Sequence, residues 1–529
     1  MVGHSSSHTA AAVRIGNAIR QLAGNDTVSK IRFSFDTRSS LATTYRSQGS
    51  DIGLLSGLLG FETHDKRIPG AYKYALNAGI DCSFEVKDMG TGHPNAYYAD
   101  LTCASGKQLN LIAVSCGGGM IEITGFMGFP VSIDGGFFET LIICQNKESA
   151  VVMQMINKTV FNKHIVSISK KSGKSLINIK AEEKLPIDFS EFDIYRINPV
   201  LPVISQITPN IPFISAEEIG NYPNSNILLW ELAVLYESER SGLKPDAVIK
   251  KMGAIVDTLK QSLMASLVSL ENTKNGKPGT EARILPNQSI LIEANDNMLG
   301  GRFNKNVIKY VTRFMDIKTS MGVFVAAPTA GSCGALSGTI FALAEELKLS
   351  DDEIVRAFLS AGLIGVIIAH RSTFAAEIGG CQAECGSGSG MCAAACAGIL
   401  GASSKACLSA ASMALQNIFG LVCDPVGNKV EVPCLGKNIM AAFNAIASAN
   451  MAVSGYDEVI PLDETIAAMD SVGRSIPREL RCTGLGGLSM TKTSVEILKK
   501  FSCNDKEEVG SIKMDAVNEP KTSLTVLRK

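Results

Sequence analysis

The spacing of hydrophobic and polar residues changes character along the chain of 529 residues. Up to about residue 140, helical periodicity as in "TAAAVRIGNAIRQLAG" alternates with strand-like runs such as "KIRFSFDT" and "KQLNLIAVS". Apolar residues three and four positions apart predict a helix, whereas strict alternation predicts a strand. The pattern therefore predicts an α+β domain over residues 1–139.

A smaller unit is predicted over residues 140–207. "TLIICQN" predicts a strand, "KESAVVMQMINKTV" a helix, and "HIVSISKKSGKSLINIKAEE" a hairpin that turns at Ser172-Gly173. A short helical piece and a strand at "VLPVISQIT" are expected to follow. The order strand, helix, strand, strand, helix, strand is that of a ferredoxin-like fold.

Long helical patterns dominate the second half of the chain. Residues 208–225 are rich in Pro, Asn and Ser and predict a linker. "ILLWELAVLYESERSG", "DDEIVRAFLSAGLIGVIIA" and "KNIMAAFNAIASANMAVSG" predict a mainly α-helical domain over residues 226–494. Residues 495–529 are charged and lack periodicity, which predicts a flexible tail.

Composition and charge narrow the possible partners. The formal net charge is −1, so we expect no nucleic-acid partner. The chain opens "MVGHSSSHTA", without a charged and then apolar signal, so we expect a cytoplasmic protein. Between Cys385 and Cys423 the only charged residue is Lys405, but Gly, Ala, Ser and Cys dominate there. That composition predicts buried core helices and no membrane partner.

The fourteen cysteines fall into two groups. Without a secretion signal they favour metal binding, redox chemistry or burial over disulfides. Cys392, Cys396 and Cys407 lie in apolar helical patterns, which predicts packing roles. Cys423 and Cys434, in "GLVCDPVGNKVEVPC", each lie near a proline that stiffens the backbone, as a preorganised metal site requires. Their spacing alone is not specific for a metal.

Several motifs, in order along the chain, resemble the iron–sulfur-dependent L-serine dehydratases of bacteria. "APTAGSCGALSGTIFAL", "EIGGCQAE", "GLVCDPV", "VEVPCLGKN" and "RCTGLGGLS" are similar to the alpha chain of that family. "GHSSSHTAAAVRIG", "GHPN" and "SCGGGMIEI" are similar to its beta chain, and residues 140–207 resemble the ACT-type domain of some members. The resemblance implies a fused chain: an α+β N-terminal domain, a small ACT-like ferredoxin-fold domain and a mainly α-helical C-terminal catalytic domain.

The same resemblance implies a cofactor and a reaction. It implies a [4Fe-4S] cluster held by Cys381, Cys423 and Cys434, with one iron open to the substrate L-serine. Such an iron would act as a Lewis acid on the leaving hydroxyl group, and the enamine product would hydrolyse to pyruvate and ammonia. We expect no pyridoxal phosphate, because no lysine has a convincing cofactor context. The N-terminal hydroxyls and C-terminal thiols must meet, so we expect the halves to dock within one chain or across a homodimer.

Among the six histidines, His8 in "SSSHT" and His93 in "GHPN" lie in family-like motifs. Imidazole titrates near working pH, so we expect either to serve in substrate binding or proton transfer, and the sequence does not decide which is the base. A serine run before a helix normally caps it, and the surplus hydroxyl and N–H groups are expected to bind a carboxylate. The residues expected to contact substrate are Ser5, Ser6, Ser7, Thr9, Asn95, Gly118 and Asn438.

Departures from the family keep other functions open. Relatives carry an asparagine- and serine-rich segment before the first ligand, where this chain has His370, Arg371 and Glu377 in "AHRSTFAAEIGGC". The substrate could therefore be L-threonine, L-cysteine or another β-substituted amino acid, or the protein could be a non-catalytic amino-acid or oxygen sensor. Neither Cys482 nor Cys503 matches the terminal cysteine that caps the cluster in some relatives, so no fourth ligand is predicted. The ACT-like unit has "NKESAV" where effector-binding examples carry a glycine, so effector binding stays open.

Overall fold

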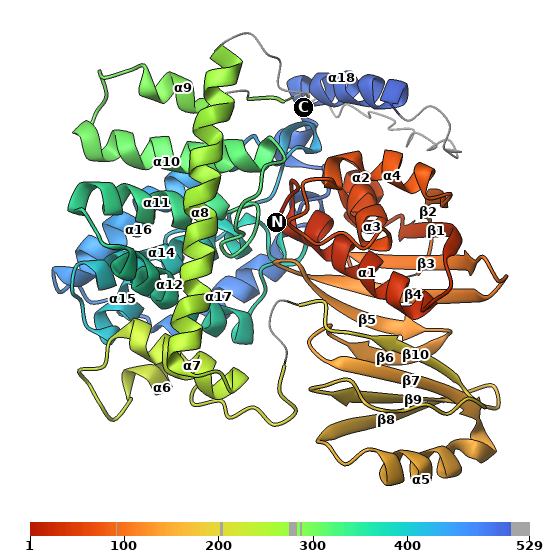
Figure 1. The fold of residues 1–529 in the computed structure, drawn as a ribbon. Helices are drawn as coiled ribbons and strands as arrows, with labels where there is room; N and C mark the ends of the chain where they lie inside the picture. Colours follow the sequence, from red (N-terminus) through yellow and green to blue (C-terminus); the bar gives the residue numbers. More distant parts are fainter. Residues whose placement is uncertain (91, 202–204, 275–282, 286–287, 509–529) are drawn as a thin grey trace.

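Sheets form the N-terminal part of the molecule and helices form its C-terminal part (Figure 1). The computed structural model describes all residues except 91, 202–204, 275–282, 286–287 and 509–529. The N-terminus lies where the two parts meet (Figure 1). The predicted α+β region followed by a mainly helical region is confirmed.

The first sheet has six strands in the order β2-β1-β3-β4-β5-β6. β1 and β2 are parallel, joined by a crossover that contains α2, α3 and α4, and each other neighbouring pair is antiparallel. Alternating burial along β3 and β4 turns one face of the sheet toward α1. The bounds are α1 Ala11–Ala23, β1 Val28–Asp36, α2 Leu41–Thr44, α3 Ser50–Leu58, α4 Ala71–Asn77, β2 Asp81–Lys87, β3 Ala96–Cys103, β4 Gln108–Gly117, β5 Met120–Phe126 and β6 Phe129–Ile133.

Glycines allow α1 and α3 to pack in direct backbone contact. A Cβ on Gly16 would lie 3.0 Å from the Cα of Gly57, and a Cβ on Gly57 would lie 2.7 Å from the Cα of Gly16. A Cβ on Gly53 would lie 2.6 Å from the carbonyl oxygen of Thr9. This contact matters for the site described below, because α3 fixes the turn that precedes α1.

Replacing Gly57 with alanine is expected to lower the free energy of unfolding by about 1–3 kcal/mol. The new Cβ would overlap the carbonyl oxygen of Val13 and lie 2.6 Å from the backbone nitrogen of Asn17, and these backbone atoms cannot swing aside. Thermal unfolding measures the change. Gly362→Ala is the matched control, since a Cβ there meets nothing within 4 Å and alanine favours a helix. Equal destabilisation by both substitutions would contradict this account.

The second sheet has four antiparallel strands in the order β10-β7-β9-β8, and α5 covers one face. Its helix links two parallel strands that are separated by a third, which is the split arrangement of ferredoxin-like units. The hairpin turns where predicted, with positive φ at Ser172 and Gly173. The bounds are β7 Phe138–Gln145, α5 Ser149–Thr159, β8 His164–Lys171, β9 Lys174–Ala181 and β10 Asp193–Ile197.

The end of this unit differs from the expected order. No helix lies between β9 and β10, a stretch that the structure describes throughout, and Pro186 within it disfavours a helix. The last strand is "DIYRI", in which the buried side chains of Tyr195 and Ile197 alternate with less buried ones, and not "VLPVISQIT". Residues 202–204 of that second stretch lie outside the described residues.

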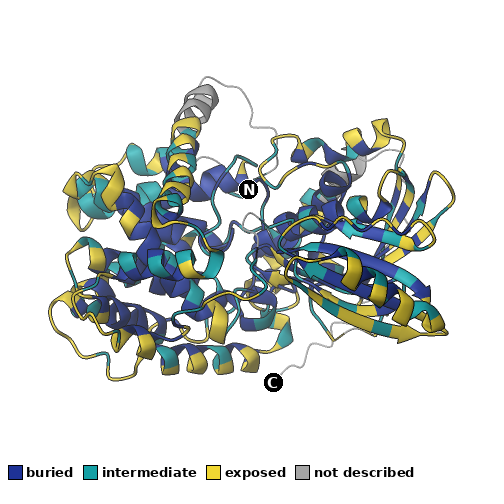
Figure 2. Cartoon of the chain, turned by 60° about the horizontal axis from the view of Figure 1, so that its bottom comes forward, coloured by how far each residue is buried: buried dark blue, intermediate teal, exposed yellow. Residues whose placement is uncertain are grey.

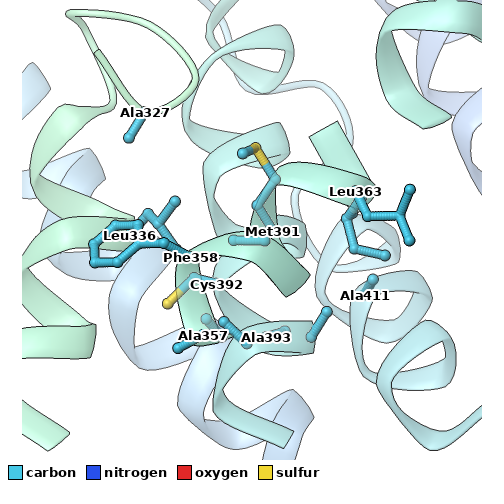
Figure 3. Packing of buried hydrophobic residues seen from close by; sticks show 14 of the residues in the cluster. Ala327, Leu336, Ala357, Phe358, Leu363, Met391, Cys392, Ala393 and Ala411 are labelled. Carbon is cyan, nitrogen blue, oxygen red and sulfur yellow. The ribbon is translucent and has the colours of Figure 1, made fainter. Parts of the chain in front are cut away.

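The helical part is organised around α14. This helix packs against α11, α12, α15 and α16, and its residues Cys385–Ala397 are all buried. Most of them are Gly, Ala, Ser or Cys, so neighbouring helices approach closely, while Leu336, Phe358 and Met391 fill the remaining space (Figure 3). The bounds are α6 Ala216–Gly220, α7 Leu229–Ser241, α8 Pro245–Lys274, α9 Gln288–Glu293, α10 Gly301–Thr319, α11 Cys333–Leu347, α12 Asp351–Arg371, α13 Ala376–Gly379, α14 Cys385–Ile399, α15 Ser404–Gln416, α16 Cys434–Val453, α17 Leu462–Ser475 and α18 Lys492–Glu508.

Three of the cysteines pack in this core as predicted. Cys392, Cys396 and Cys407 are buried in the main apolar cluster, and the sulfur atoms of the first two lie 3.8 Å apart. Cys381 does not lie on the same helix as Cys392 and Cys396. It begins a separate 3₁₀ turn after Gly380, and α14 begins only at Cys385.

α12 is the single helix within the described residues that is long and apolar enough to cross a membrane. Two thirds of its apolar stretch (67%) is buried inside the molecule. Figure 2 shows that buried residues gather at the centre of the helical part. The core helix of a water-soluble protein passes the same test of length and composition, so α12 gives no reason to place the chain in a membrane.

The predicted linker and tail both contain helix. In the linker, Ser215 caps α6, and Phe213 and Ile219 are buried against the helical part. The tail was expected to lack structure from residue 495, but α18 continues to Glu508. Residues 509–529 of the predicted tail lie outside the described residues.

Candidate active site

The two parts of the chain meet along a buried interface that carries most of the predicted site residues. The glycine turn after β4 touches the segment before α13: Gly117 pairs with Phe374, and a Cβ on Gly117 would lie 2.6 Å from the backbone nitrogen of Ala375. Nearby, the backbone N–H of Ala330 donates to Ser6 Oγ over 3.3 Å. The expected docking of the halves therefore takes place within one chain.

The serine run forms a tight, buried turn at the start of the first helix. Residues Ser6–Ala10 form a π-helical turn that runs directly into α1. Ser5 caps it, since its Oγ accepts a hydrogen bond from the backbone N–H of His8. Thr9 Oγ1 donates to the carbonyl oxygen of Gln48 over 2.8 Å, and Ser7, also buried, accepts a hydrogen bond at its carbonyl from Tyr97.

His8 lies at the centre of the interface with both ring nitrogens engaged. Its Nε2 is 3.0 Å from Thr44 Oγ1, and its Nδ1 is 3.1 Å from Ser5 Oγ. Across the interface, Oε1 of Glu377 on α13 lies 3.5 Å from the same Nδ1. Burial lowers the pKa of His8 to about 3 and raises the pKa of Glu377. His8 is therefore a neutral imidazole at physiological pH.

His93, Asn95 and Gly118 surround this centre from the sheet side. His93 is half-buried and its Nδ1 accepts a hydrogen bond from the Asn95 backbone N–H (3.1 Å), while burial lowers its pKa. Asn95 is buried, and its Oδ1 accepts a hydrogen bond from Ser40 Oγ over 2.7 Å. Gly118 has φ +59°, and a Cβ there would lie 3.7 Å from the carbonyl oxygen of Pro328.

Cys381, Cys423 and Cys434 come from three separate segments and are buried together. Cys381 begins a 3₁₀ turn, Cys423 lies on extended backbone that donates to the carbonyl of Leu480 (2.8 Å), and Cys434 is the first residue of α16. A hydrogen bond with Cys482 raises the pKa of Cys423, and burial raises the pKa of Cys434. A negative charge on Cys381 would raise both pKa values further. Cys381 is thus close enough to influence each of the other two thiols.

Two further buried thiols and two cations complete the surroundings. Cys385 hydrogen-bonds Cys381 and thereby lowers its pKa, and Cys482 accepts a hydrogen bond from Gln48 Nε2 over 3.4 Å. Lys437 donates to Asp424 over 3.0 Å. Burial opposes the charge of Lys437, but Cys381 and Cys423 raise its pKa overall. Lys318, fully buried, donates to the carbonyl oxygen of Val430 and favours the charged form of Cys434.

This set of donors fits an iron–sulfur cluster better than a single ion. Within the described part of the chain, no three His, Cys, Asp or Glu side chains are placed to hold one metal ion. The five thiols here are all free, buried and accompanied by lysines, and thiolates are the ligands of iron–sulfur clusters. A cluster of several irons takes ligands that stand farther apart than those of one ion.

Residues 224–489, half of the chain, match the family described as serine dehydratase alpha chain. The chain belongs to the L-serine dehydratase family. It is 35% identical over 275 residues to a probable L-serine dehydratase alpha chain of Bacillus subtilis, a match that covers 52% of this chain and 90% of the relative. The L-serine dehydratase alpha chain of Peptoniphilus asaccharolyticus is 34% identical over 288 residues, covering 54% of this chain and 97% of the relative.

The L-serine dehydratase match extends to the second type of chain. A probable L-serine dehydratase beta chain of Bacillus subtilis is 36% identical over 211 residues, covering 39% of this chain and 92% of the relative. Portions similar to alpha and beta chains are therefore fused in one polypeptide, as the motifs indicated.

Within this L-serine dehydratase fold, Asn438 serves as a clamp. Its Oδ1 accepts hydrogen bonds from the backbone N–H groups of Gly334 and Ala335, over 3.1 and 2.9 Å. Its Nδ2 donates to the carbonyl oxygens of Gly331 and Cys434, over 2.7 and 2.8 Å. These contacts join the start of α11 to the backbone of Cys434. The expected contact of Asn438 with substrate stays a prediction.

His370 and Arg371 lie outside the site. Both are exposed at the end of α12; His370 hydrogen-bonds the Tyr236 hydroxyl over 3.0 Å, and Arg371 pairs with Asp463 over 2.9 Å. The suggestion that either contacts a substrate group has no support in these positions, because other partners hold both side chains.

Glu377 is the third charge of that segment, and it does belong to the site. Sequence reasoning had singled it out as a charge in an apolar run but had given it no role in this L-serine dehydratase family member. Cys385 and Lys318 were not predicted, and Cys482 was set aside because it does not match the terminal cysteine of relatives, although it lies in the family-like motif "RCTGLGGLS". Cys385 could have been noticed, since it follows Cys381 by four residues, but nothing local connects Lys318 with the site.

Proposed function

We propose that this chain deaminates L-serine to pyruvate and ammonia by β-elimination of water, with a [4Fe-4S] cluster as cofactor. The observation that supports the proposal is the contact of His8 with Glu377 across one interface, four residues before Cys381, one of three buried thiols that would hold the cluster. Family membership and the fused alpha-like and beta-like portions support it.

Cys381, Cys423 and Cys434 would hold the cluster. When bound, it would supply a Lewis acid that eases the departure of hydroxide from Cβ of serine. Lys437 and Lys318 balance the negative charge of the thiolates, which in apolar surroundings would otherwise be costly. Asn438 fixes the backbone at Cys434 and so the direction of one ligand.

His8 is the better placed of the two histidines to accept the Cα proton. It is neutral, fully buried and flanked by hydroxyl groups of Ser5 and Thr44 that orient its ring. His93 is half-buried and is held by a backbone contact at Asn95. We assign the base to His8 and a substrate-binding role to His93.

The N-terminal turn would bind the substrate carboxylate. Ser6 faces the helical part, where its Oγ accepts a hydrogen bond from the backbone N–H of Ala330. The start of a helix favours a negative charge. Ser5, Ser7, Thr9, Asn95 and Gly118 would shape this pocket through the contacts described above.

We also propose that residues 140–207 are an ACT-like unit, supported by the split order of the second sheet. The domain limits, effector binding by this unit and a homodimeric state stay predictions. Analytical ultracentrifugation of the anaerobic protein addresses the last of these.

Anaerobic turnover of a panel of amino acids tests the proposal. We expect kcat/KM for L-serine to exceed that for L-threonine by about 10- to 200-fold, the discrimination that one extra carbon allows. Iron and labile-sulfide content, measured on the same sample, should indicate one cluster per chain and should fall in air together with activity. A preference for L-threonine or L-cysteine would favour the alternative substrates, and binding of L-serine without pyruvate formation would favour a sensor.

A further inference from the structure

The geometry points to Glu377 as the carboxylate that binds the α-ammonium group of the substrate. This assignment rests on the proposed function and adds a residue that determines specificity for an amino acid. An α-amino acid brings a cation into the site, and the described residues offer a buried anion to receive it.

Glu377 is buried at the centre of the interface. Its side chain is 2% exposed, and the short helix α13 places it four residues before Cys381. Its Oε1 lies 3.5 Å from Nδ1 of His8, which comes from the opposite half of the molecule. A group bound to this carboxylate therefore lies close to the proposed base.

One oxygen of this carboxylate is left without a partner. Oε2 of Glu377 and Nδ2 of the adjacent Asn95 are both buried and make no hydrogen bond of ordinary geometry, although the Asn95 amide is close enough to the carboxylate to lower its pKa. Ser40 holds the Oδ1 of Asn95, which fixes the direction of the amide. Buried polar atoms are almost always satisfied, so an unsatisfied acceptor next to an unsatisfied donor indicates a place for a polar ligand.

The charge of Glu377 is also unbalanced. The basic group near it in the described part of the chain is His8, which burial keeps neutral. Burying a carboxylate without a cation is costly, and this cost raises the pKa of Glu377. A substrate ammonium group would pair with this carboxylate and stabilise its charged form, and this contact would favour substrate binding.

A second buried carboxyl group shows why the assignment falls on Glu377. Glu384 is nearby and burial raises its pKa to about 8, but Thr329 hydrogen-bonds it and the positive charge of Lys318 acts on it. Glu384 thus has protein partners for its charge. Glu377 differs in that the groups described beside it, the Asn95 amide and the neutral His8, carry no positive charge.

Binding at Glu377 also positions the reacting atoms. The ammonium nitrogen and the hydrogen that must leave are both attached to Cα. A contact between the ammonium group and Glu377 therefore brings the Cα–H bond beside His8, the proposed base. Cys381, one of the proposed cluster ligands, follows α13 directly in the chain.

Glu377→Gln, purified anaerobically with its cluster, tests the inference. We expect KM for L-serine to rise by about 30-fold or more, as when one partner of a buried charged pair is removed. The probe that isolates the ammonium contact is L-glycerate, which replaces the ammonium group of L-serine with a hydroxyl. Its inhibition constant should stay unchanged or improve, so the ratio of the L-serine KM to the L-glycerate Ki should rise.

Glu384→Gln is the matched control and should leave that ratio at its wild-type value. A fall in kcat with an unchanged ratio in Glu377→Gln would show that Glu377 only positions His8, and would overturn the inference. If Glu377→Gln does not fold around its cluster, Glu377→Asp is tested in its place. Aspartate keeps the carboxylate but its side chain is one methylene shorter, so the ratio of the L-serine KM to the L-glycerate Ki must still rise.

The test separates this inference from the proposed function. If the wild-type protein forms no pyruvate, the function fails, but titration calorimetry with L-serine and L-glycerate still measures the ratio. A rise of that ratio in Glu377→Gln would support the ammonium contact, and an unchanged ratio would refute it.

Discussion

Replacing Cys423 with alanine is expected to leave the anaerobically purified protein with little iron or labile sulfide and to lower kcat/KM for L-serine by at least about 100-fold. Changing a group that merely supports a metal ligand costs 10- to 100-fold in metal affinity, so loss of a ligand should cost at least the upper end of that range. Cys423 is also held firmly, since its backbone bonds to Leu480 and Cys482 on both sides. No shift of the chain could bring another residue of this segment into its place.

Cys482 is the thiol that hydrogen-bonds Cys423, so it is the first candidate to replace it. The double variant Cys423→Ala/Cys482→Ala removes that route and should lose any residual iron. Cys407→Ala is the matched control: it deletes an equally buried thiol from α15, away from the interface, and should lower stability without loss of iron. Full iron content in Cys423→Ala/Cys482→Ala would refute the ligand set.

The sequence pattern correctly predicted the features that depend only on residues close together in the chain. The long helices of the second half, the hairpin at Ser172-Gly173 and the packing roles of Cys392, Cys396 and Cys407 follow from periodicity, turn chemistry and apolar surroundings, and the structure contains them. The prolines near Cys423 and Cys434 likewise marked the segments that meet at the interface.

What the sequence could not show depends on long-range contacts. Glu377 acquires its importance only because α13 faces a turn from the other end of the chain, and its distance to His8 has no local signal. Cys482 reaches the thiols through a strand-like bridge between Cys423 and Arg481. The missing helix before β10 is a local error of a different kind, since Pro186 and the alternation in "DIYRI" were visible but outweighed by the expected fold.

Replacing His8 with asparagine is expected to lower kcat for L-serine by about 10²- to 10⁴-fold, the usual contribution of a positioned general base. Asparagine can still hydrogen-bond Ser5 or Thr44, so the fold and the cluster should survive, and the visible absorption and iron content should match those of the wild type. The primary kinetic isotope effect with L-serine deuterated at Cα should increase, because proton removal becomes rate-limiting.

Two matched substitutions give this result its meaning. His64→Asn changes an exposed histidine and should have no effect, whereas His93→Asn should raise KM more than it lowers kcat, since His93 is assigned to substrate binding. An enlarged isotope effect in His93→Asn, together with a wild-type isotope effect in His8→Asn, would instead identify His93 as the base and His8 as a substrate-binding residue. The assignment of the base to His8 rests on its neutral ring and on its position 3.5 Å from Glu377 of the opposite half.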